Sequence, residues 1–520
     1  MTDLRTRPAS AAAHVPATRK VAYAACGVLA AVAGIAVGHL VAGVVNPAAS
    51  PVLSVGSVVI DLTPTPVKEL VIAKVGTADK AILLASVSLV TLALAALAGL
   101  LTRRRKVVGI GMVLLLVLAS GAAAMTRPTA SLRDLVPAIG TGLVGVAVLL
   151  WLTRLLGSSR SASGTPPTGS SRRGFLIGAA GVTAGAVVSG ALGQRLADAS
   201  VDSSDIALPT PASPAAPLPK GVESTTQGIS PFQTPVESFY RVDTNLTVPK
   251  VPKDTWTLEV DGDVSNTLSI SYDDLLKMPM IERDITMTCV SNEVGGGYVG
   301  AGRWLGVRVT DILARAGVGT SSDQLLSTAV DGFTISTPLA VVRDGRDAMV
   351  AIALNGKPLT EAHGFPARLI TPGLYGFVGA TKWLTKLTLT TYAAQQSYWT
   401  QRQWATDAPI KTSARIDTPA PLSTIPAGKS VIGGVAWAQH RGVGKVEVQI
   451  DGGAWQPTQL GPDAGVDYWR QWYLPWDATS GQHSVAVRAT DLEGQVQADQ
   501  RVTPFPNGSS GIQQVVVLVS

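Results

Sequence analysis

The run Thr286-Met287-Thr288-Cys289-Val290-Ser291-Asn292 holds one of the two cysteines in this chain of 520 residues. The other, Cys26, lies in an apolar segment long enough to cross a membrane. Since Cys289 cannot form a disulfide with a cysteine inside a membrane helix, the sequence favours reactivity or metal ligation for this thiol. A lone cysteine can also be a small buried hydrophobe, so the interpretation depends on the residues around it.

Upstream of this run, four apolar segments are long enough to cross a bilayer, and they cover residues 21–45, 81–101, 107–125 and 135–156. A fifth, residues 174–192, is richer in Gly, Ala, Ser and Thr. It follows Arg172-Arg173, which resembles a twin-arginine export signal. We therefore expect residues 1–156 to form a four-helix transmembrane region. Residues 157–195 are expected to carry the twin-arginine-like motif and a fifth apolar helix.

Basic residues next to these segments predict their orientation, because lysine and arginine collect in cytoplasmic loops. Three clusters precede the first segment, separate the second from the third, and follow the fourth: Arg5, Arg7, Arg19 and Lys20; Arg103, Arg104, Arg105 and Lys106; Arg154, Arg160, Arg172 and Arg173. All three face the cytoplasm only if the N-terminus does so too. We expect a multi-pass cell-membrane protein with an extracytoplasmic C-terminal part.

Two further points concern export and partners. The run Ala197-Asp198-Ala199 resembles a signal cleavage site, so the sequence leaves open whether the fifth helix is removed. The net charge of +6 comes largely from the cytoplasmic clusters, and the polar half shows no basic stripe with interleaved aromatics. We expect no nucleic-acid partner.

The polar half divides into three parts. Residues 196–228 are dense in Pro, Ala and Ser, which predicts an extended, poorly ordered linker. Residues 229–403 mix short strands with helices, as in an α+β domain. Residues 404–520 alternate polar with apolar positions, with strands expected at 445–450 and 484–489, which predicts an all-β sandwich of the immunoglobulin-like kind.

Local signals support this division. A strand is expected at 256–260 with a turn at 261–263, a helix at 271–277 capped by Ser271, and a helix at 310–316 capped by Thr310 and stopped by Gly317. A hairpin turn is expected at 451–453. A cluster of tryptophans also favours a sandwich here: Trp437, Trp455, Trp469, Trp472 and Trp476.

After Cys289 the polar half carries a series of motifs: Gly295-Gly296-Gly297, Arg303-Trp304-Leu305-Gly306-Val307, Asn355-Gly356-Lys357-Pro358-Leu359, His363-Gly364-Phe365-Pro366-Ala367-Arg368, Pro372-Gly373 and Lys382-Trp383-Leu384. Together these motifs resemble the molybdenum-binding core of the sulfite oxidase family. The likeness runs in the same order from about Phe239 to the C-terminus. It implies a membrane-anchored bacterial form with a molybdopterin-binding oxidoreductase domain and a C-terminal dimerisation domain, hence a possible homodimer.

The resemblance also implies roles for individual residues. Cys289 would be the protein ligand of a molybdenum held by one pterin dithiolene. Cofactor binding is implied for Tyr240, Arg241, Cys289, Asn292, His363, Arg368, Gly376, Phe377 and Lys382. Arg368 and Lys382 suit a phosphate as charge-assisted donors, and the amides of a turn at residues 376–377 can approach it closely. Asn292 is expected to brace the cysteine loop.

The residues expected at the reacting centre are Cys289, Trp304, Tyr298 and Arg303. Trp304 matches a position that lines the substrate funnel in relatives, and Tyr298 is expected nearby. Arg303 is the expected source of positive charge for a small oxyanion, with Arg241 as the alternative. One departure concerns the substrate, because Glu293 and glycines follow the cysteine where dedicated sulfite oxidases carry arginines. An acidic residue there repels sulfite.

Electron transfer is expected to need a separate carrier. The chain shows no CxxCH motif and no iron–sulfur cysteine pattern, and His39 is the one histidine in the apolar segments, so neither haem nor an iron–sulfur cluster is predicted. The leading hypothesis is an extracytoplasmic enzyme that transfers an oxygen atom to or from a small substrate. A sulfoxide reductase of the methionine-sulfoxide-reducing type and a non-catalytic cell-surface binding protein are the alternatives.

Overall fold

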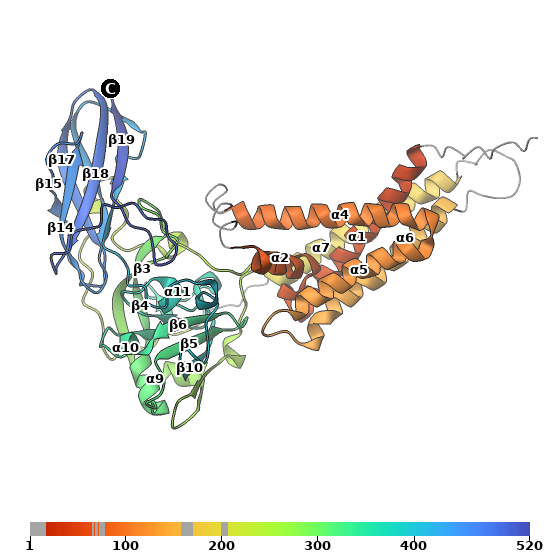
Figure 1. Cartoon of the computed structure of the whole chain (residues 1–520), viewed down its shortest axis with the longest axis horizontal. Coiled ribbons are helices and arrows are strands. Elements are labelled where there is room, and N and C mark those ends of the chain that lie inside the picture. Colours follow the sequence, from red (N-terminus) through yellow and green to blue (C-terminus); the bar gives the residue numbers. More distant parts are fainter. Residues whose placement is uncertain (1–16, 65–66, 68–70, 72–77, 158–169, 199–205) are drawn as a thin grey trace, which may run out of the picture. The chain divides into compact units, whose positions relative to one another are not determined.

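The computed structural model describes residues 17–64, 67, 71, 78–157, 170–198 and 206–520. The chain divides into two compact units, a helical unit (residues 1–199 with 245–247) and a β-rich unit (residues 200–244 and 248–520) (Figure 1). Arg5, Arg7, Arg160 and residues 199–205 of the expected linker lie outside the described residues, as does the side chain of Arg172.

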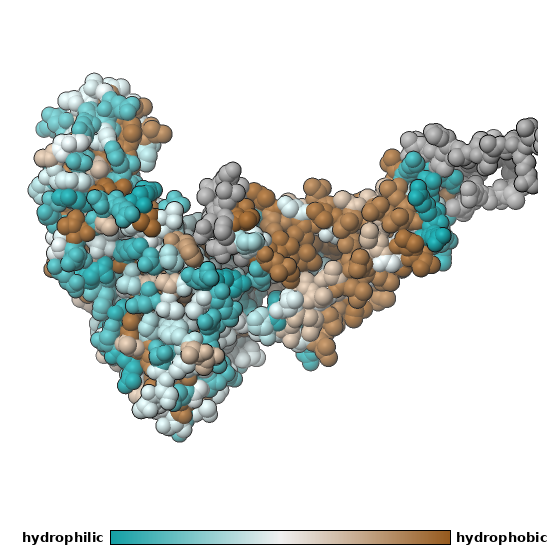
Figure 2. Space-filling view, in the orientation of Figure 1, coloured by the Kyte–Doolittle hydropathy of each residue, from teal (hydrophilic) through white to brown (hydrophobic). Residues whose placement is uncertain are grey.

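The helical unit contains the long helices α1 (Ala17–Val45), α4 (Asp79–Arg104), α5 (Lys106–Met125), α6 (Val136–Gly157) and α7 (Ser170–Asp198), and the shorter α2 (Pro51–Leu62). Among the described residues, five helical stretches are long and apolar enough to cross a membrane: Arg19–Val45, Asp79–Arg104, Lys106–Met125, Leu132–Leu156 and Arg173–Asp198. Apolar side chains cover the surface of this unit (Figure 2). The five expected apolar helices are confirmed, whereas α2 was not predicted.

Helix α7 packs directly on α1. At Gly193 a Cβ atom would lie 2.8 Å from the Cα of Leu40, so only glycine permits this close approach of the two backbones. Beside it, Nε2 of His39 lies 3.2 Å from Oε1 of Gln194. Small residues and polar pairs of this kind hold helices together in lipid, where the hydrophobic effect does not. The fifth apolar helix is thus part of the bundle.

Two sheets form the first part of the β-rich unit. One has the order β2-β1-β10-β5-β6 and contains β1 (Thr257–Gly262), β2 (Leu268–Ser271), β5 (Gln324–Ala329), β6 (Thr334–Pro338) and β10 (Leu384–Thr390). The other has the order β3-β4-β7-β8, with β9 on β7, and contains β3 (Met280–Thr288), β4 (Val299–Arg308), β7 (Met349–Leu354), β8 (Lys357–Pro358) and β9 (Arg368–Ile370). The α-helices are α8 (Tyr272–Leu276), α9 (Val309–Ala316), α10 (Leu339–Val342) and α11 (Gly376–Gly379). This is the expected α+β domain.

Two sheets of the C-terminal part pack as a sandwich. The first has the order β11-β13-β17-β16, with β11 (Ser413–Thr418), β13 (Gly428–Trp437), β16 (Gln459–Leu460) and β17 (Arg470–Ala478). The second has the order β12-β19-β18-β14-β15, with β12 (Thr424–Ile425), β14 (Val443–Ile450), β15 (Gln456–Pro457), β18 (Gly481–Asp491) and β19 (Gln513–Val519). The hairpin turn at Asp451 and Gly452 is confirmed, since both residues have a positive φ. The immunoglobulin-like type stays a prediction.

The expected tryptophan cluster is divided between two cores. Trp472 and Trp476 lie in the core of the sandwich. Trp437 and Trp469 instead pack with residues of the α+β domain, among them Val290 just after the cysteine. Trp455 is half-buried and lies under the guanidinium of Arg488, 4.3 Å from the ring centroid to Cζ. The sandwich and the α+β domain therefore share a hydrophobic core.

Three local expectations were wrong in detail. Helix α9 begins at Val309, so Arg308 rather than Thr310 occupies the N-cap position, although Gly317 ends the helix in the left-handed region as expected. Strand β1 continues through Gly262, because its pairing with β10 extends that far. The Pro-rich segment is not a free spacer where it is described, since Ser213 bridges to strand β3 and the N–H of Val222 donates to Gln471 on β17. The cap of Ser271 on α8 is confirmed.

Candidate active site

Cys289 stands where strand β3 ends, at the start of the loop that leads to β4. Its backbone N–H donates to the carbonyl of Tyr298 at 2.9 Å, and its carbonyl accepts from the N–H of Asn292 at 3.0 Å. The side-chain oxygen of Asn292 accepts from the N–H of Tyr298 at 2.8 Å. Asn292 is 5% exposed. The expectation that Asn292 braces the cysteine loop is confirmed, and Tyr298 closes the same loop.

The thiol of Cys289 is partly exposed but surrounded by protein. Desolvation raises its pKa, while hydrogen bonds from Ser291 and the charge of Lys382 lower it. A thiol with this balance is protonated when no cation is bound, and a metal ion displaces the proton because thiolate is the ligand. Binding of a metal ion would therefore convert the Cys289 thiol to the thiolate that coordinates the metal.

Two tyrosines lie close enough to Cys289 for its charge to act on them. Burial raises the pKa of Tyr240, the thiolate of Cys289 raises it further, and the nearby Arg368 lowers it. Burial also raises the pKa of Tyr375 to about 12, with a smaller contribution in the same direction from Cys289. Tyr240 was expected here. Tyr375 was missed, although it directly precedes the expected cofactor turn at residues 376–377.

Arg368 is the most unusual charge in the domain. It lies on β9 and is 6% exposed, with Nη1 donating to the carbonyl of His363 at 3.2 Å. Its Nε is buried without a hydrogen-bond partner, and no carboxylate among the described residues pairs with it. Burial lowers its pKa to about 10. Since a buried cation without a counter-ion is strongly unfavourable, this position is suited to an anionic ligand.

The indole ring of Trp304 packs against the guanidinium of Arg368. The Cζ of Arg368 lies 5.4 Å from the centroid of the Trp304 ring, within the range of a cation–π interaction. Trp304 is 0% exposed, and its Nε1 donates to the carbonyl of Ile285 at 3.3 Å. A fully enclosed indole cannot line an open substrate funnel. The expected role of Trp304 is thus corrected to that of a platform beneath Arg368.

Arg303 is also corrected. Its Nε and Nη2 donate to the carboxylate of Asp284 at 2.8 and 2.7 Å, and Nη2 also contacts the carbonyl of Ala216. Successive side chains of a strand point to opposite faces, so Arg303 and the buried Trp304 of β4 cannot both reach one site. The guanidinium is committed to Asp284 and does not supply free positive charge beside Cys289.

His363 is 8% exposed and neutral, because burial and the charge of Arg368 lower its pKa to about 4. Its Nε2 lies 3.3 Å from the carbonyl of Phe239, which can only accept, so Nε2 carries the proton. The hydroxyl of Thr360 then donates to Nδ1 at 2.7 Å. Both ring nitrogens are used within the protein, so His363 positions Phe239 and Arg368 instead of donating to a ligand itself.

Lys382 and Arg241 are linked by a carboxylate that the sequence did not reveal. Asp243 accepts from Nζ of Lys382 at 2.9 Å and from Nε of Arg241 at 2.7 Å. Burial lowers the pKa of Lys382 to about 8 despite this partner. The side chain of Arg241 is 38% exposed, whereas that of Lys382 is 11% exposed. Lys382 is therefore a buried cation near the thiol, and Arg241 lies toward its solvent side.

The expected turn at residues 376–377 is the start of the helical turn α11. The first amides of a helix have no partner within the helix, which leaves those of Gly376 and Phe377 suited to an acceptor. The ring of Phe377 is 7% exposed and lies 5.4 Å from that of Trp404. Phe377 is thus fixed by packing, and its contact with a pterin stays a prediction.

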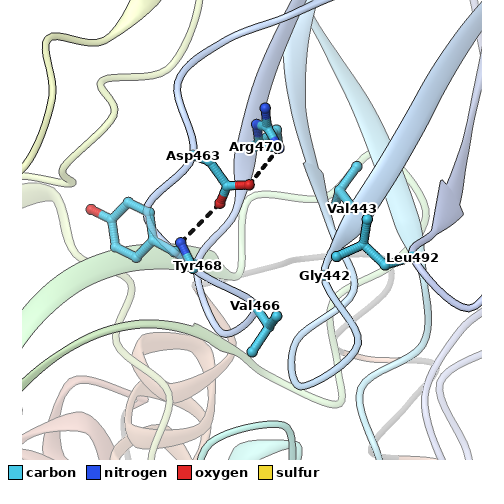
Figure 3. A pocket seen from close by; sticks show the side chains of 8 residues that line it. Gly442, Val443, Asp463, Val466, Tyr468, Arg470 and Leu492 are labelled. Atoms are coloured by element: carbon cyan, nitrogen blue, oxygen red, sulfur yellow. Dashed lines mark hydrogen bonds and ion pairs between the residues drawn. The ribbon is translucent and has the colours of Figure 1, made fainter.

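Pockets elsewhere in the β-rich unit do not contain this chemistry. One of about 200 Å³ lies on the sandwich, beside the ion pair of Asp463 and Arg470 at 2.8 Å (Figure 3). Another of about 260 Å³ is lined by Arg283, Arg346 and His440 among others. Neither is lined by Cys289 or Arg368. The convergence of a thiol with a buried unpaired guanidinium is stronger evidence for a site than the volume of a pocket.

Comparison with known proteins identifies this chemistry. Residues 245–399 match the family model described as the oxidoreductase molybdopterin binding domain. The chain is 30% identical over 316 residues to mitochondrial sulfite oxidase of Rattus norvegicus, and 31% identical over 316 residues to that of Homo sapiens. The matched part of the chain is a molybdopterin-binding oxidoreductase domain of the sulfite oxidase kind. In each case the match covers 51% of this chain and 57% of the relative, so the chain spans little more than half the length of these relatives.

A nitrate reductase and a solved dehydrogenase structure are also similar to this chain. The nitrate reductase [NAD(P)H] of Hordeum vulgare is 28% identical over 325 residues, which is 50% of this chain and 36% of that protein. The solved structure of the sulfane dehydrogenase SoxCD from Paracoccus pantotrophus has 23% identity and a TM-score of 0.49, covering 55% of this chain and 83% of that chain. The family-model match and the sulfite oxidases support an oxidoreductase with a molybdopterin-binding domain.

Proposed function

We propose that the chain is a membrane-anchored, extracytoplasmic enzyme of the sulfite oxidase family that transfers an oxygen atom to or from a small substrate. The observation that carries the proposal is the buried guanidinium of Arg368, whose Nε has no partner, in one cluster with Tyr240 and the thiol of Cys289. A structural arginine in a core would be paired with a carboxylate, as Arg303 is with Asp284. An unpaired one implies a ligand that brings the negative charge.

The residues present fit a molybdenum–pterin group. When bound, such a group supplies two-electron oxygen-atom transfer, which is an oxidation or reduction of the substrate. Cys289 would be its protein thiolate, because it is a partly exposed cysteine in a rigid loop. Arg368 and Lys382 would neutralise the phosphate of the pterin as charge-assisted donors.

The residues around the thiol also bear on the substrate. Tyr240 and Tyr375 are electrically coupled to Cys289. The ring of Tyr298 lies 6.4 Å from that of Tyr240. Burial raises the pKa values of Tyr240 and Tyr375, so these two hydroxyl groups are neutral at physiological pH. Such hydroxyl groups can donate hydrogen bonds to the oxygen of an uncharged substrate.

This arrangement supports reduction of a sulfoxide as the second candidate activity. Glu293 is exposed beside the cysteine loop. Of the two arginines expected to attract an oxyanion, Arg303 is bound to Asp284 and Arg241 to Asp243. Both features disfavour sulfite. A neutral sulfoxide is not repelled by Glu293, and its oxygen can accept hydrogen bonds from phenolic hydroxyls.

Anchoring and partners are part of the proposal. Five apolar helices support a multi-pass topology, and the basic clusters beside them support a cytoplasmic N-terminus. The packing of α7 on α1 supports retention of the fifth helix after export. Electrons would pass to or from a separate carrier. A homodimer through the C-terminal sandwich follows from the family resemblance.

Metal analysis and a substrate panel test the proposal. The full chain is purified in detergent, and its molybdenum content is measured with that of the Cys289→Ser and Arg368→Met variants. We expect about one molybdenum per wild-type chain, and less in Arg368→Met because the cofactor phosphate loses its buried partner. Dye-coupled oxidation of sulfite is then compared with reduction of sulfoxides. A wild-type protein that binds no molybdenum in a host that makes the cofactor contradicts the enzyme proposal and favours a cell-surface binding protein.

A further inference from the structure

The C-terminal sandwich holds the cysteine loop from outside the α+β domain. Arg415 on β11 donates from Nη1 to the carbonyl of Gly296 at 3.0 Å. Ser509, in the segment before β19, donates from its hydroxyl to the carbonyl of Asn292 at 2.5 Å. Gly295 has a φ of 80°, and a Cβ atom there would lie 2.8 Å from the side chain of Gln513. Three side chains of the sandwich thus contact consecutive parts of one loop.

Arg415 is itself rigidly held. Its Nε donates to Asp417 at 2.6 Å, and its Nη2 donates to the hydroxyl of Ser230 at 2.8 Å. The second oxygen of Asp417 accepts from the N–H of Ser230 at 2.9 Å. The side chains of Arg415 and Asp417 are 12% and 8% exposed. Charge-assisted bonds of this length define a single orientation, so the Nη1 group reaches Gly296 from a fixed point.

Ser509 acts on the loop through Asn292. The residue whose carbonyl accepts from Ser509 also donates its N–H to the carbonyl of Cys289 and accepts at its side chain from Tyr298. One hydrogen bond from the sandwich therefore holds the residue that contacts both ends of the loop. On the apolar side, Val290 packs in the shared core with Trp437 of the sandwich.

We propose that Arg415 and Ser509 are positioning residues for the metal site. The sandwich, through these two side chains, sets the location and orientation of the Cys289 thiolate relative to the metal. The inference rests on the proposed function in one respect, since it takes Cys289 as the ligand. The physical reason is that a displacement of about 1 Å at a reacting centre can reduce a rate about a hundredfold, even when the change lies away from the chemistry.

The test compares Arg415→Ala, Ser509→Ala and Arg415→Lys with Arg488→Ala in the full chain. Arg488 is the matched control, because it also lies in the sandwich and pairs with a carboxylate, Glu447, at 3.0 Å, yet touches no residue of the cysteine loop in the contacts described above. Each variant is measured for molybdenum content, kcat and KM. Two further readouts are the electron paramagnetic resonance spectrum of the partly reduced metal and amide hydrogen exchange across residues 289–298.

We expect Arg415→Ala to keep its molybdenum and its KM while kcat falls about ten- to a hundredfold. Its resonance spectrum should shift or broaden, and the amides of the loop should exchange faster than in Arg488→Ala. Ser509→Ala should show the same pattern, and Arg415→Lys should recover part of kcat because an ammonium can still reach one carbonyl. Equal kcat, spectra and loop exchange in Arg415→Ala and Arg488→Ala would overturn the proposal.

The exchange measurement separates this inference from the proposed function. If the wild-type protein binds no molybdenum, the function fails while faster loop exchange in Arg415→Ala still supports the sandwich as the element that fixes the loop. If molybdenum is present and loop exchange is unchanged, the function stands and the positioning role fails.

Discussion

Replacing Arg368 by methionine should stabilise the protein without its cofactor and prevent the cofactor from being held. Burial lowers the pKa of this guanidinium to about 10, and each pKa unit corresponds to about 1.4 kcal/mol between charged and neutral forms. The folded apoprotein therefore carries a penalty of about 3 kcal/mol for keeping Arg368 charged. Methionine has similar length and no charge, so it removes the penalty while filling most of the space.

The sign of the effect with pH follows from the lowered pKa. Below the folded pKa, arginine is charged in both the folded and the unfolded chain, and the full penalty applies. As the pH rises above about 10, the folded state releases its proton first, so the wild type should regain stability that the Arg368→Met variant already has. The gap between the two proteins should narrow only in strongly alkaline solution.

Denaturation of the apoprotein checks this directly. The wild type and Arg368→Met are expressed without synthesis of the molybdenum cofactor and unfolded with denaturant at neutral pH, with tryptophan fluorescence as the signal. The control is Arg303→Met, which removes a paired guanidinium and leaves Asp284 buried without its partner. It should lose about 1–3 kcal/mol, whereas Arg368→Met should gain about 2–3 kcal/mol. A loss of stability in Arg368→Met would refute the view that this charge awaits an anionic ligand.

Two further predictions concern the bundle and the sandwich. Gly193→Leu should separate α7 from α1 and lower the melting temperature in detergent, because a side chain at this position meets the backbone of Leu40. The control is Gly185→Leu on the same helix, which should change the melting temperature little because no atom lies within 4 Å of the added Cβ. Equal melting temperatures of the two variants would contradict the packing of α7 on α1. His483 is the pH-sensitive group of the sandwich, since its hydrogen bond to Asp451 raises its pKa. Its stabilising bond is complete below about pH 6.5, the unfolded value, and is lost as the pH rises through the raised pKa. The protection of the β14–β18 amides, measured as their exchange rate relative to that of an unfolded chain at the same pH, should therefore fall toward pH 8 in the wild type. Asp451→Asn should abolish this fall in protection, and the same fall in the variant would count against the role of His483.

The sequence was most informative about features that depend on a short stretch of residues alone. The length of apolar runs predicts the five long helices, because crossing a bilayer requires a fixed number of apolar residues. The solitary Cys289 within a set of family motifs predicts the ligand position. Both signals are local, and neither depends on which residues meet in space.

Partners of charged side chains could not be read from the sequence. Arg303 and Asp284 face each other across two strands, and their ion pair depends on the register of β3 with β4. The support of the cysteine loop by Arg415 joins residues that are 119 positions apart. One error was avoidable, because adjacent residues of a strand face opposite sides, so Arg303 and Trp304 could not both point to the metal site.

The sulfur coordination of molybdenum in the Cys289→Ser variant tests the central claim most directly. The full chain is purified as wild type and as the variant, loaded in a host that makes the cofactor, and examined by X-ray absorption at the molybdenum edge. If Cys289 is the protein ligand, the variant should show one sulfur neighbour fewer than the wild type and lose activity. An unchanged sulfur shell in Cys289→Ser would contradict the account.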